Sequence, residues 1–193
     1  MKYIGSKVLG TDNLILRPTQ EKDLKILWEI LLDENVSRYY LTSKINSDWE
    51  EEKKWQYKKL SHALDKDIFQ WSIVLRSENR CIGQVSCQKI EGNSDDSVRD
   101  VGWFLESKFH GHGLGSEAAK RMLDYMFNDV EIRKIETSAA TVNAPSWKIM
   151  EKLGFHRTGE VKKCKYTMLP DPVDCYCYEI TSEEYIKLKK TLK

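Results

Sequence analysis

The sequence predicts an α/β protein in which helices cover both faces of a mixed β-sheet. Three observations support this fold class. The 193 residues suit one domain with one core, and 40% hydrophobic with 32% charged residues is an ordinary globular composition. Strand and helix patterns follow in the order β-α-α-β-β-β-α-β-α-β, with hairpins first and βαβ units later. Because no repeat, low-complexity tract or linker interrupts the chain, we expect residues 1–193 to form a single domain.

The chain opens with a strand and a helix. Residues 13–19 (NLILRPT) alternate in polarity and include Pro18, which favours a first strand that ends there. Thr19 is placed to cap a helix over residues 20–32. That helix carries one apolar stripe, formed by Leu24, Leu27, Trp28 and Leu31.

A second helix and a hairpin follow. The helix over residues 47–60 begins with Ser47 and Glu50 at the spacing of a capping box, and its thin apolar stripe suits a position on the surface. Residues 69–77 and 80–90 are alternating runs rich in β-formers, and the short connection between them predicts a β-hairpin.

The second half alternates strands and helices. We expect strands over residues 98–105 and 134–142 and helices over residues 116–127 and 144–155, the last one ended by Gly154. A late strand over residues 175–181 and a helical tail over residues 182–193 complete the chain.

Three glycines occupy alternate positions, Gly111, Gly113 and Gly115, between a strand and a helix. Glycine lets a ligand approach the backbone, and a helix N-terminus offers unpaired N–H groups and a positive dipole end. The pattern therefore predicts an anion site, with phosphate as the usual ligand. The G-x-G-x-G spacing matches neither the P-loop nor the dinucleotide fingerprint. A tight turn without a ligand is the alternative.

Two polar residues mark the next strand-to-helix junction. Asn143 follows the strand over 134–142, and Ser146 lies in the first turn of the next helix. Taken alone, they are an N-cap and an exposed helical residue. A right-handed crossover would place this strand parallel to the one over 98–105, so that both carboxyl ends open into one crevice.

Four motifs, in register and in order, resemble the GNAT family of acetyl-CoA-dependent N-acetyltransferases, and most closely its RimJ/RimL-like branch of ribosomal-protein N-terminal acetyltransferases. They are HGHGLG (110–115), DVGWFL (100–105), the N-x-x-S pair Asn143 and Ser146, and EKLGF (151–155). The opening NLILRPT and the closing CYCYEITSEEY extend the resemblance over almost the whole chain. The loop begins with His in place of Gln or Arg, and the strand carries Asp in place of Glu.

The resemblance implies the acyl-CoA N-acyltransferase fold, in which the sheet splays and acetyl-CoA lies as co-substrate in a V-shaped gap. No metal is implied. Pantetheine would bond to the backbone of Trp103, Phe104 and Leu105. The pyrophosphate would lie on the loop N–H groups, with both histidine side chains pointing outward; the loop residues are His110, Gly111, His112, Gly113, Leu114, Gly115 and Ser116. Asn143, Ser146 and Lys152 would complete the coenzyme site, together with Lys148 unless these lysines are only solvated.

The chemistry implied is direct attack of a neutral amine on a thioester. This reaction needs hydrogen-bond donors for the carbonyl oxygen and a hydrogen bond for the leaving thiolate. By resemblance, Ser146 would bond to the coenzyme sulfur, and Asn143 would hold the pantetheine arm or orient a water. Asp100 is the candidate base, with a surface acid or a proton-relaying water chain as alternatives. Lys165 stands where some branch members carry a glutamate base, and a cation cannot serve as one.

The acceptor would lie where the N-terminal helices meet the late strands. Tyr39, Tyr40 and Trp49 are candidates to line it, although the same residues also suit plain packing. Tyr166, Tyr176 and Tyr178 are further candidate proton donors, with a place in the core or in the pocket wall as the alternative for each. A protein N-terminus, a polyamine and a small amine all stay open as acceptors.

Composition excludes other classes. A net charge of +1 gives no basic footprint for binding nucleic acid. The candidate segment of the protein for such binding would be the basic tail KLKKTLK. The start has no apolar signal core, and no apolar run approaches the roughly 18 residues of a membrane span. The five cysteines form no C-x-x-C pair, so we expect reduced thiols in the cytoplasm and no zinc. A monomer or homodimer is expected, and a non-catalytic acyl-CoA-binding module is the alternative function.

Overall fold

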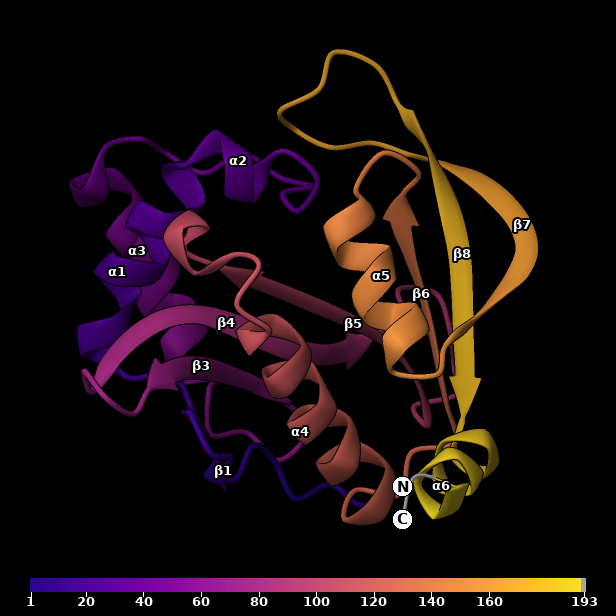
Figure 1. Ribbon diagram of the computed structural model, residues 1–193. Helices are drawn as coiled ribbons and strands as arrows, with labels where there is room; N and C mark the ends of the chain where they lie inside the picture. The colour runs from indigo at the N-terminus through magenta and orange to yellow at the C-terminus, as the bar shows by residue number, and fades with distance from the viewer. Residues whose placement is uncertain (192–193) are drawn as a thin grey trace.

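The computed structural model describes residues 1–191 and contains an eight-stranded sheet of order β1-β2-β3-β4-β5-β6-β8-β7 (Figure 1). The strands are β1 (Leu9–Gly10), β2 (Leu14–Arg17), β3 (Gln70–Leu75), β4 (Arg80–Lys89), β5 (Val98–Leu105), β6 (Lys134–Ala140), β7 (His156–Cys164) and β8 (Val173–Thr181). The helices are α1 (Glu21–Leu32), α2 (Glu34–Ser37), α3 (Trp49–Ser61), α4 (Leu114–Asn128), α5 (Ala144–Lys152) and α6 (Ser182–Thr191), with a 3₁₀ turn at Ser107–Phe109.

The sheet has two antiparallel parts that meet at one short parallel junction. Strands β1 to β5 form the first part, and β6, β8 and β7 form the second. Between them, β5 and β6 pair only at Val98 with Lys134 and at Arg99 with Ile135. Beyond these residues the two strands diverge, and the sheet opens as a V. The mixed, splayed sheet is therefore confirmed.

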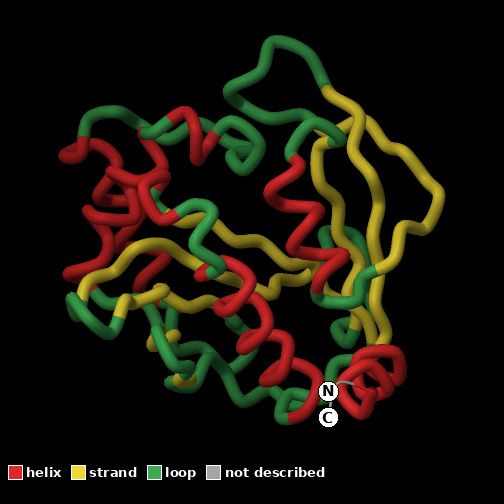
Figure 2. Tube along the Cα trace, in the orientation of Figure 1, coloured by secondary structure: helices red, strands yellow, loops and turns green. Residues whose placement is uncertain are grey.

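Helices cover both faces of the first part. The apolar face of α4 is buried in the main core with Val85 and Val101, through Met122, Leu123 and Met126, which are fully buried. On the opposite face, α1 places Leu27 and Ile30 against Cys81 and Phe104. Figure 2 shows the red helices on either side of the yellow strands. The predicted helices on both faces are thus confirmed.

Two helix starts differ from the prediction. The N-cap of α1 is Gln20 and not Thr19, because the Gln20 N–H is held by the Asp23 carboxylate at 2.8 Å. The N-cap of α3 is Asp48 and not Ser47, because the Asp48 carboxylate accepts from the N–H of Glu50 at 2.8 Å. In both cases a carboxylate at or near the helix start is the stronger acceptor for an orphan N–H.

Strand β7 was not predicted. Nearly all of its residues are exposed, and Gly159 interrupts it at φ +88°, so neither apolar alternation nor an unbroken run marks it in the sequence. It forms because β8 supplies a partner along its length, apart from a register shift between Arg157 and Val161. The predicted tail helix is α6, and its last two predicted residues lie outside the described part. No helix within residues 1–191 has the length and apolar character needed to cross a membrane.

Candidate active site

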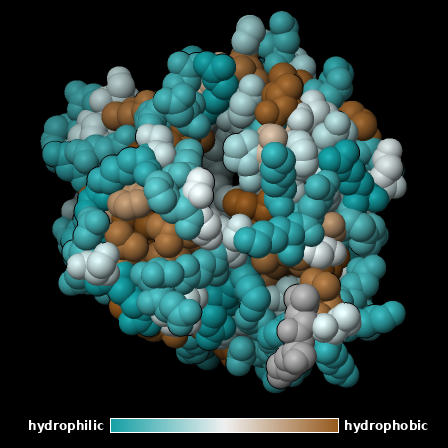
Figure 3. All heavy atoms as spheres, in the orientation of Figure 1, coloured by the Kyte–Doolittle hydropathy of each residue, from teal (hydrophilic) through white to brown (hydrophobic). Residues whose placement is uncertain are grey.

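The opening between β5 and β6 exposes one backbone edge of β5. The N–H of Glu106 donates to the carbonyl of Ile82 on β4 at 2.8 Å, so even-numbered residues of β5 pair with β4 and odd-numbered ones face away. Beyond Arg99, no strand of the described chain pairs with that free edge. Trp103 therefore directs its N–H and carbonyl into the opening. Figure 3 shows a hollow in the surface between the two parts of the molecule.

The neighbours of Trp103 present less backbone to the opening. Phe104 pairs with Gln84, so its backbone groups face β4, and its ring packs on Tyr40 at a centroid distance of 4.9 Å. Leu105 faces the opening, and its carbonyl lies 2.9 Å from Nε2 of His110. The free backbone groups at this end of β5 are thus those of Trp103 and the N–H of Leu105.

The glycine loop leads from β5 into α4 and leaves the helix N-terminus open. Gly113 is the N-cap of α4 in the left-handed conformation, at φ +81°, and no side chain caps the helix. Gly111 is also left-handed, at φ +80°. The first helical hydrogen bond comes from the N–H of Glu117, so the N–H groups of Leu114, Gly115 and Ser116 have no partner within the helix. This is the geometry of an anion site.

The third glycine has a different role. A Cβ on Gly115 would lie 3.3 Å from Cδ1 of Ile149 and 3.4 Å from Cδ1 of Leu105. At Gly111 and Gly113, by contrast, a Cβ would meet nothing within 4 Å. Gly115 therefore allows α4 to approach α5 and β5 closely, while the two earlier glycines shape the loop and leave open space before it.

Both loop histidines are exposed, and one of them also makes a local hydrogen bond. Nε2 of His110 lies 2.9 Å from the carbonyl of Leu105. Nε2 must carry the proton in that contact, because a carbonyl can only accept. The ring thus fastens the start of the loop to the end of β5. His112 is exposed. Within residues 1–191, no group of three or more His, Cys, Asp or Glu side chains could hold a metal ion.

Helix α5 begins at the wide end of the opening (Figure 1), and Asn143 and Ser146 belong to this first part of the helix. Asn143 is the N-cap residue, and its carbonyl accepts from the N–H of Ser146 at 3.1 Å. Its side chain makes no capping bond, and no described residue hydrogen-bonds to the Ser146 hydroxyl. Both side chains, each half-buried, are available to a ligand.

The two lysines of α5 differ in surroundings. Lys148 is exposed and lies over the ring of Trp147, with Nζ 5.9 Å from the ring centroid. Lys152, at the end of the helix, is exposed and forms no ion pair with any other described residue. It lies one turn after Ile149, which contacts Gly115 at the start of α4.

Asp100 lies where the sheet begins to open. Its Oδ1 accepts from the N–H of Val101 at 2.8 Å. Burial raises the pKa of the Asp100 carboxyl, although hydrogen bonds from Thr137 and Val101 and the charge of Lys162 oppose the rise. A carboxyl whose pKa is raised by burial, at the edge of an opening, is a candidate proton acceptor.

Tyr40 covers this region from the N-terminal helices. A Cβ on Gly102 would lie 3.5 Å from the Tyr40 ring and 3.6 Å from Oγ of Ser86, so glycine makes room for both. Burial and the negative charge of Asp100 raise the pKa of Tyr40 to about 12. Tyr40 therefore stays protonated and can donate a hydrogen bond.

The loop between β7 and β8 contacts the segment that follows α2. The N–H of Thr167, in the loop between β7 and β8, donates to the carbonyl of Leu41 at 2.8 Å. The rings of Tyr39 and Tyr166 meet edge to face at 5.9 Å, and the Tyr166 hydroxyl lies 3.5 Å from Sγ of Cys175. Residues 39–41 and residues 166–167, which are distant in sequence, thus pack against each other beside the opening.

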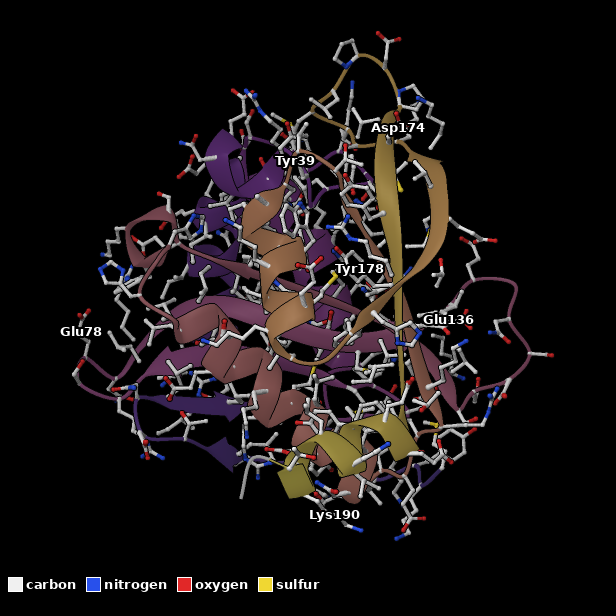
Figure 4. All side chains as sticks on the ribbon, turned by 45° about the vertical axis from the view of Figure 1, so that its right-hand side comes forward. Tyr39, Glu78, Glu136, Asp174, Tyr178 and Lys190 are labelled. Carbon is white, nitrogen blue, oxygen red and sulfur yellow. The ribbon has the colours of Figure 1, made fainter. Side chains whose placement is uncertain are left out.

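Other candidates lie elsewhere. Trp49 packs on Trp28 of α1 at 5.2 Å, which attaches α3 to α1. Tyr176 and Tyr178 contact α5 through Trp147 and Glu151, and Figure 4 labels Tyr178 beside that helix. The Arg157 guanidinium is 3.9 Å from the Tyr176 ring centroid, and its Nε is 2.8 Å from the Tyr178 hydroxyl. Lys165, which directly follows β7, is exposed.

Sequence patterns alone missed several residues around Asp100. Thr137 donates to the carbonyl of Val101 at 3.3 Å, across the base of the opening, and Ser86 and Tyr40 come from other elements. The alternation of β4 and β6 would have placed Ser86 and Thr137 on a known face, but not next to Asp100. Only the pairing of the strands brings them together.

Comparisons with known proteins agree with this geometry. Residues 13–156 match the family model described as the acetyltransferase (GNAT) domain. An uncharacterized N-acetyltransferase of Bacillus subtilis, YnaD, is 28% identical over 180 residues, which cover 92% of this chain and 98% of the relative. A GNAT-family acetyltransferase from Bacillus anthracis superposes with a TM-score of 0.77 at 26% identity, over 92% of this chain and all of that one. RimJ from Mycobacterium smegmatis, solved with CoA-disulfide, gives a TM-score of 0.77 at 19% identity, over 92% and 88% of the chains.

The family match covers the opening, the glycine loop and the start of α5, which are the elements that the geometry points to. Acetyl-CoA is the co-substrate that this fold implies, and the open α4 N-terminus fits its pyrophosphate. The chain belongs to the GNAT family and is an acetyl-CoA-dependent N-acetyltransferase.

Proposed function

We propose that the protein transfers the acetyl group of acetyl-CoA to a primary amine by direct attack, and that it is a member of the RimJ/RimL-like branch. One observation carries this proposal: the free edge of β5 beyond Arg99 leads directly to the uncapped N-terminus of α4. An extended pantetheine arm can pair with the edge as a strand would, while the pyrophosphate lies on the helix N–H groups.

The proposed coenzyme contacts use the backbone groups of β5 and α4 that have no partner within the sheet or the helix. The N–H and carbonyl of Trp103 hold the pantetheine arm, and the N–H groups of Leu114, Gly115 and Ser116 hold the pyrophosphate. The free Asn143 amide contacts the arm from the α5 side. Lys152 adds positive charge near the phosphates. Phe104 contributes packing only, since its backbone pairs with β4.

The reaction needs a neutral amine and a stabilised thiolate. Asp100 receives the proton of the attacking amine, directly or through a water, and its raised pKa brings it closer to that of an efficient base at neutral pH. The Ser146 hydroxyl donates a hydrogen bond to the departing sulfur. A serine hydroxyl is a weak acid, so the bond stabilises the thiolate without full proton transfer. The acceptor amine enters on the side of Tyr40 and Tyr166.

The test combines turnover and binding. The protein is incubated with acetyl-CoA and with peptides that begin with Ala or Ser, spermidine and a small aminoglycoside, while free thiol release is followed. We expect thiol release with at least one amine and a rise in melting temperature with acetyl-CoA. A thermal rise without release on any amine would favour a non-catalytic module and contradict the acceptor proposal. Absence of both would contradict the coenzyme site as well.

A further inference from the structure

The second part of the sheet places a lysine on the acceptor side. Lys162 of β7 is in register with Cys175 of β8, and Cys175 is in register with Ala140 of β6. Directly opposed residues share a face of the sheet. Cys175 is the residue that Tyr166 contacts at 3.5 Å, and Tyr166 in turn meets Tyr39. Lys162 therefore lies on the same face of the sheet as the contacts between Cys175, Tyr166 and Tyr39.

The charge of Lys162 also acts on Asp100. The ammonium group lowers the pKa of the Asp100 carboxyl, against the larger rise that burial causes. Glu160, two residues earlier, acts on Cys177 instead. An amine at Asp100 would thus lie within the electrostatic range of the Lys162 ammonium group.

The ammonium group of Lys162 is free. It is exposed and forms no ion pair with any residue in the described range 1–191. Its neighbour Lys163 is in register with Asp174, on the opposite face, and is bound to it at 2.8 Å. Figure 4 shows Asp174 near the loop end of β8. An unpaired cation beside the acceptor path attracts an anion and repels a second cation.

We propose that Lys162 is a specificity-determining residue, and that the preferred acceptor is a primary amine that carries a carboxylate close to the reacting nitrogen. The inference rests on the proposed function. An acidic side chain next to a protein N-terminus and the carboxylate of a small amino acid share this chemistry. A polyamine lacks it and brings further positive charge toward Lys162.

The experiment compares acceptors that differ only in charge. The peptides Ala-Glu-Ala-Ala, Ala-Gln-Ala-Ala and Ala-Lys-Ala-Ala represent a protein N-terminus. The small-molecule arm uses 4-aminobutyrate and its amide. We expect wild type to prefer the acid over the matched amide by about 10- to 100-fold in kcat/KM in at least one arm, as for one hydrogen bond to a charged group. The arm with the larger ratio identifies the source of the carboxylate.

Variants assign the preference to one residue. Lys162→Gln should remove the preference for acid over amide, Lys162→Glu should favour the lysine peptide, and Lys163→Gln, the matched control, should keep the wild-type ratio. Since the side chains of Lys162 and Lys163 are both exposed, all three variants should melt near the wild-type temperature.

Three outcomes would overturn the inference. Wild type could treat acid and amide alike, or Lys163→Gln could lose the preference as Lys162→Gln does. Lys162→Gln could also lower kcat/KM equally for every acceptor while moving the pH profile, which would make it a positioning residue for Asp100. Absence of thiol release with every amine is a different failure, because it removes the proposed function itself.

Discussion

Replacement of Gly113 by alanine tests the coenzyme site most directly. Gly113 caps α4 at φ +81°, where a side chain is strained, and a Cβ there would meet no atom within 4 Å. The expected cost is therefore the backbone strain alone, about 1–2 kcal/mol. For a chain of this size, that lowers the melting temperature by about 2–8 °C.

Gly92 provides a matched control. It has φ +78°, its Cβ would also meet nothing within 4 Å, and it lies in the turn before β5, which has no part in the site. Gly92→Ala should therefore lose a similar amount of stability. Because a changed φ at residue 113 redirects the N–H groups that follow it, only Gly113→Ala should also weaken coenzyme binding.

Thermal shift with acetyl-CoA separates the two effects. At a concentration about 100 times Kd, the ligand stabilises the native protein by about 2.7 kcal/mol, a rise of about 5–11 °C. Wild type and Gly92→Ala should both show it. A Gly113→Ala protein that binds tenfold more weakly should show about 1.4 kcal/mol at the same concentration, or about 3–6 °C. An equal rise in all three proteins would refute the assignment of the pyrophosphate to this helix terminus.

Three further outcomes are expected. Burial raises the pKa of Asp100, so the carboxylate is lost at a higher pH than an ordinary aspartate would be, and kcat/KM should fall with pH through that raised pKa. Asp100→Asn should remove this acid limb and lower turnover by about 10²- to 10⁴-fold, and an unchanged pH profile would contradict the role of Asp100 as base. Ser146→Ala should lower kcat by about 10- to 100-fold and keep the acetyl-CoA thermal shift, whereas unchanged turnover would remove the residue from the mechanism. Arg17→Ala should destabilise the fold by about 3–5 kcal/mol in denaturant titrations, because Arg17 holds the buried Asp23 at 2.5 Å, while Lys53→Ala, which breaks an exposed pair, should cost under about 1 kcal/mol.

Most features of the proposed coenzyme site could be predicted from the sequence. Gly111, Gly113 and Gly115 stand between a strand and a helix, and Asn143 and Ser146 stand at the next such junction. These features are local, because a positive φ and an uncapped helix start depend on a few consecutive residues. Even here the structure added a distinction: two glycines shape the loop, and Gly115 permits helix packing.

The proposed acceptor side could be predicted less well from the sequence, because its residues come from separate elements. Tyr40, Ser86 and Thr137 surround Asp100 only after four segments have packed, and Lys162 lies on β7, a strand that no sequence pattern marked. Exposure removes the apolar alternation by which strands are recognised, so β7 depends on pairing with β8.

The sequence by itself determined the order of most elements, the glycine loop before a helix and the family motifs, since each depends on neighbours along the chain. Only the tertiary structure decided that β5 and β6 part after Arg99, that Asp100 is desolvated there, and that the charge of Lys162 acts on the Asp100 carboxyl. Strand divergence, burial and electrostatic range are relations between distant segments, and spacing along the chain does not encode their geometry.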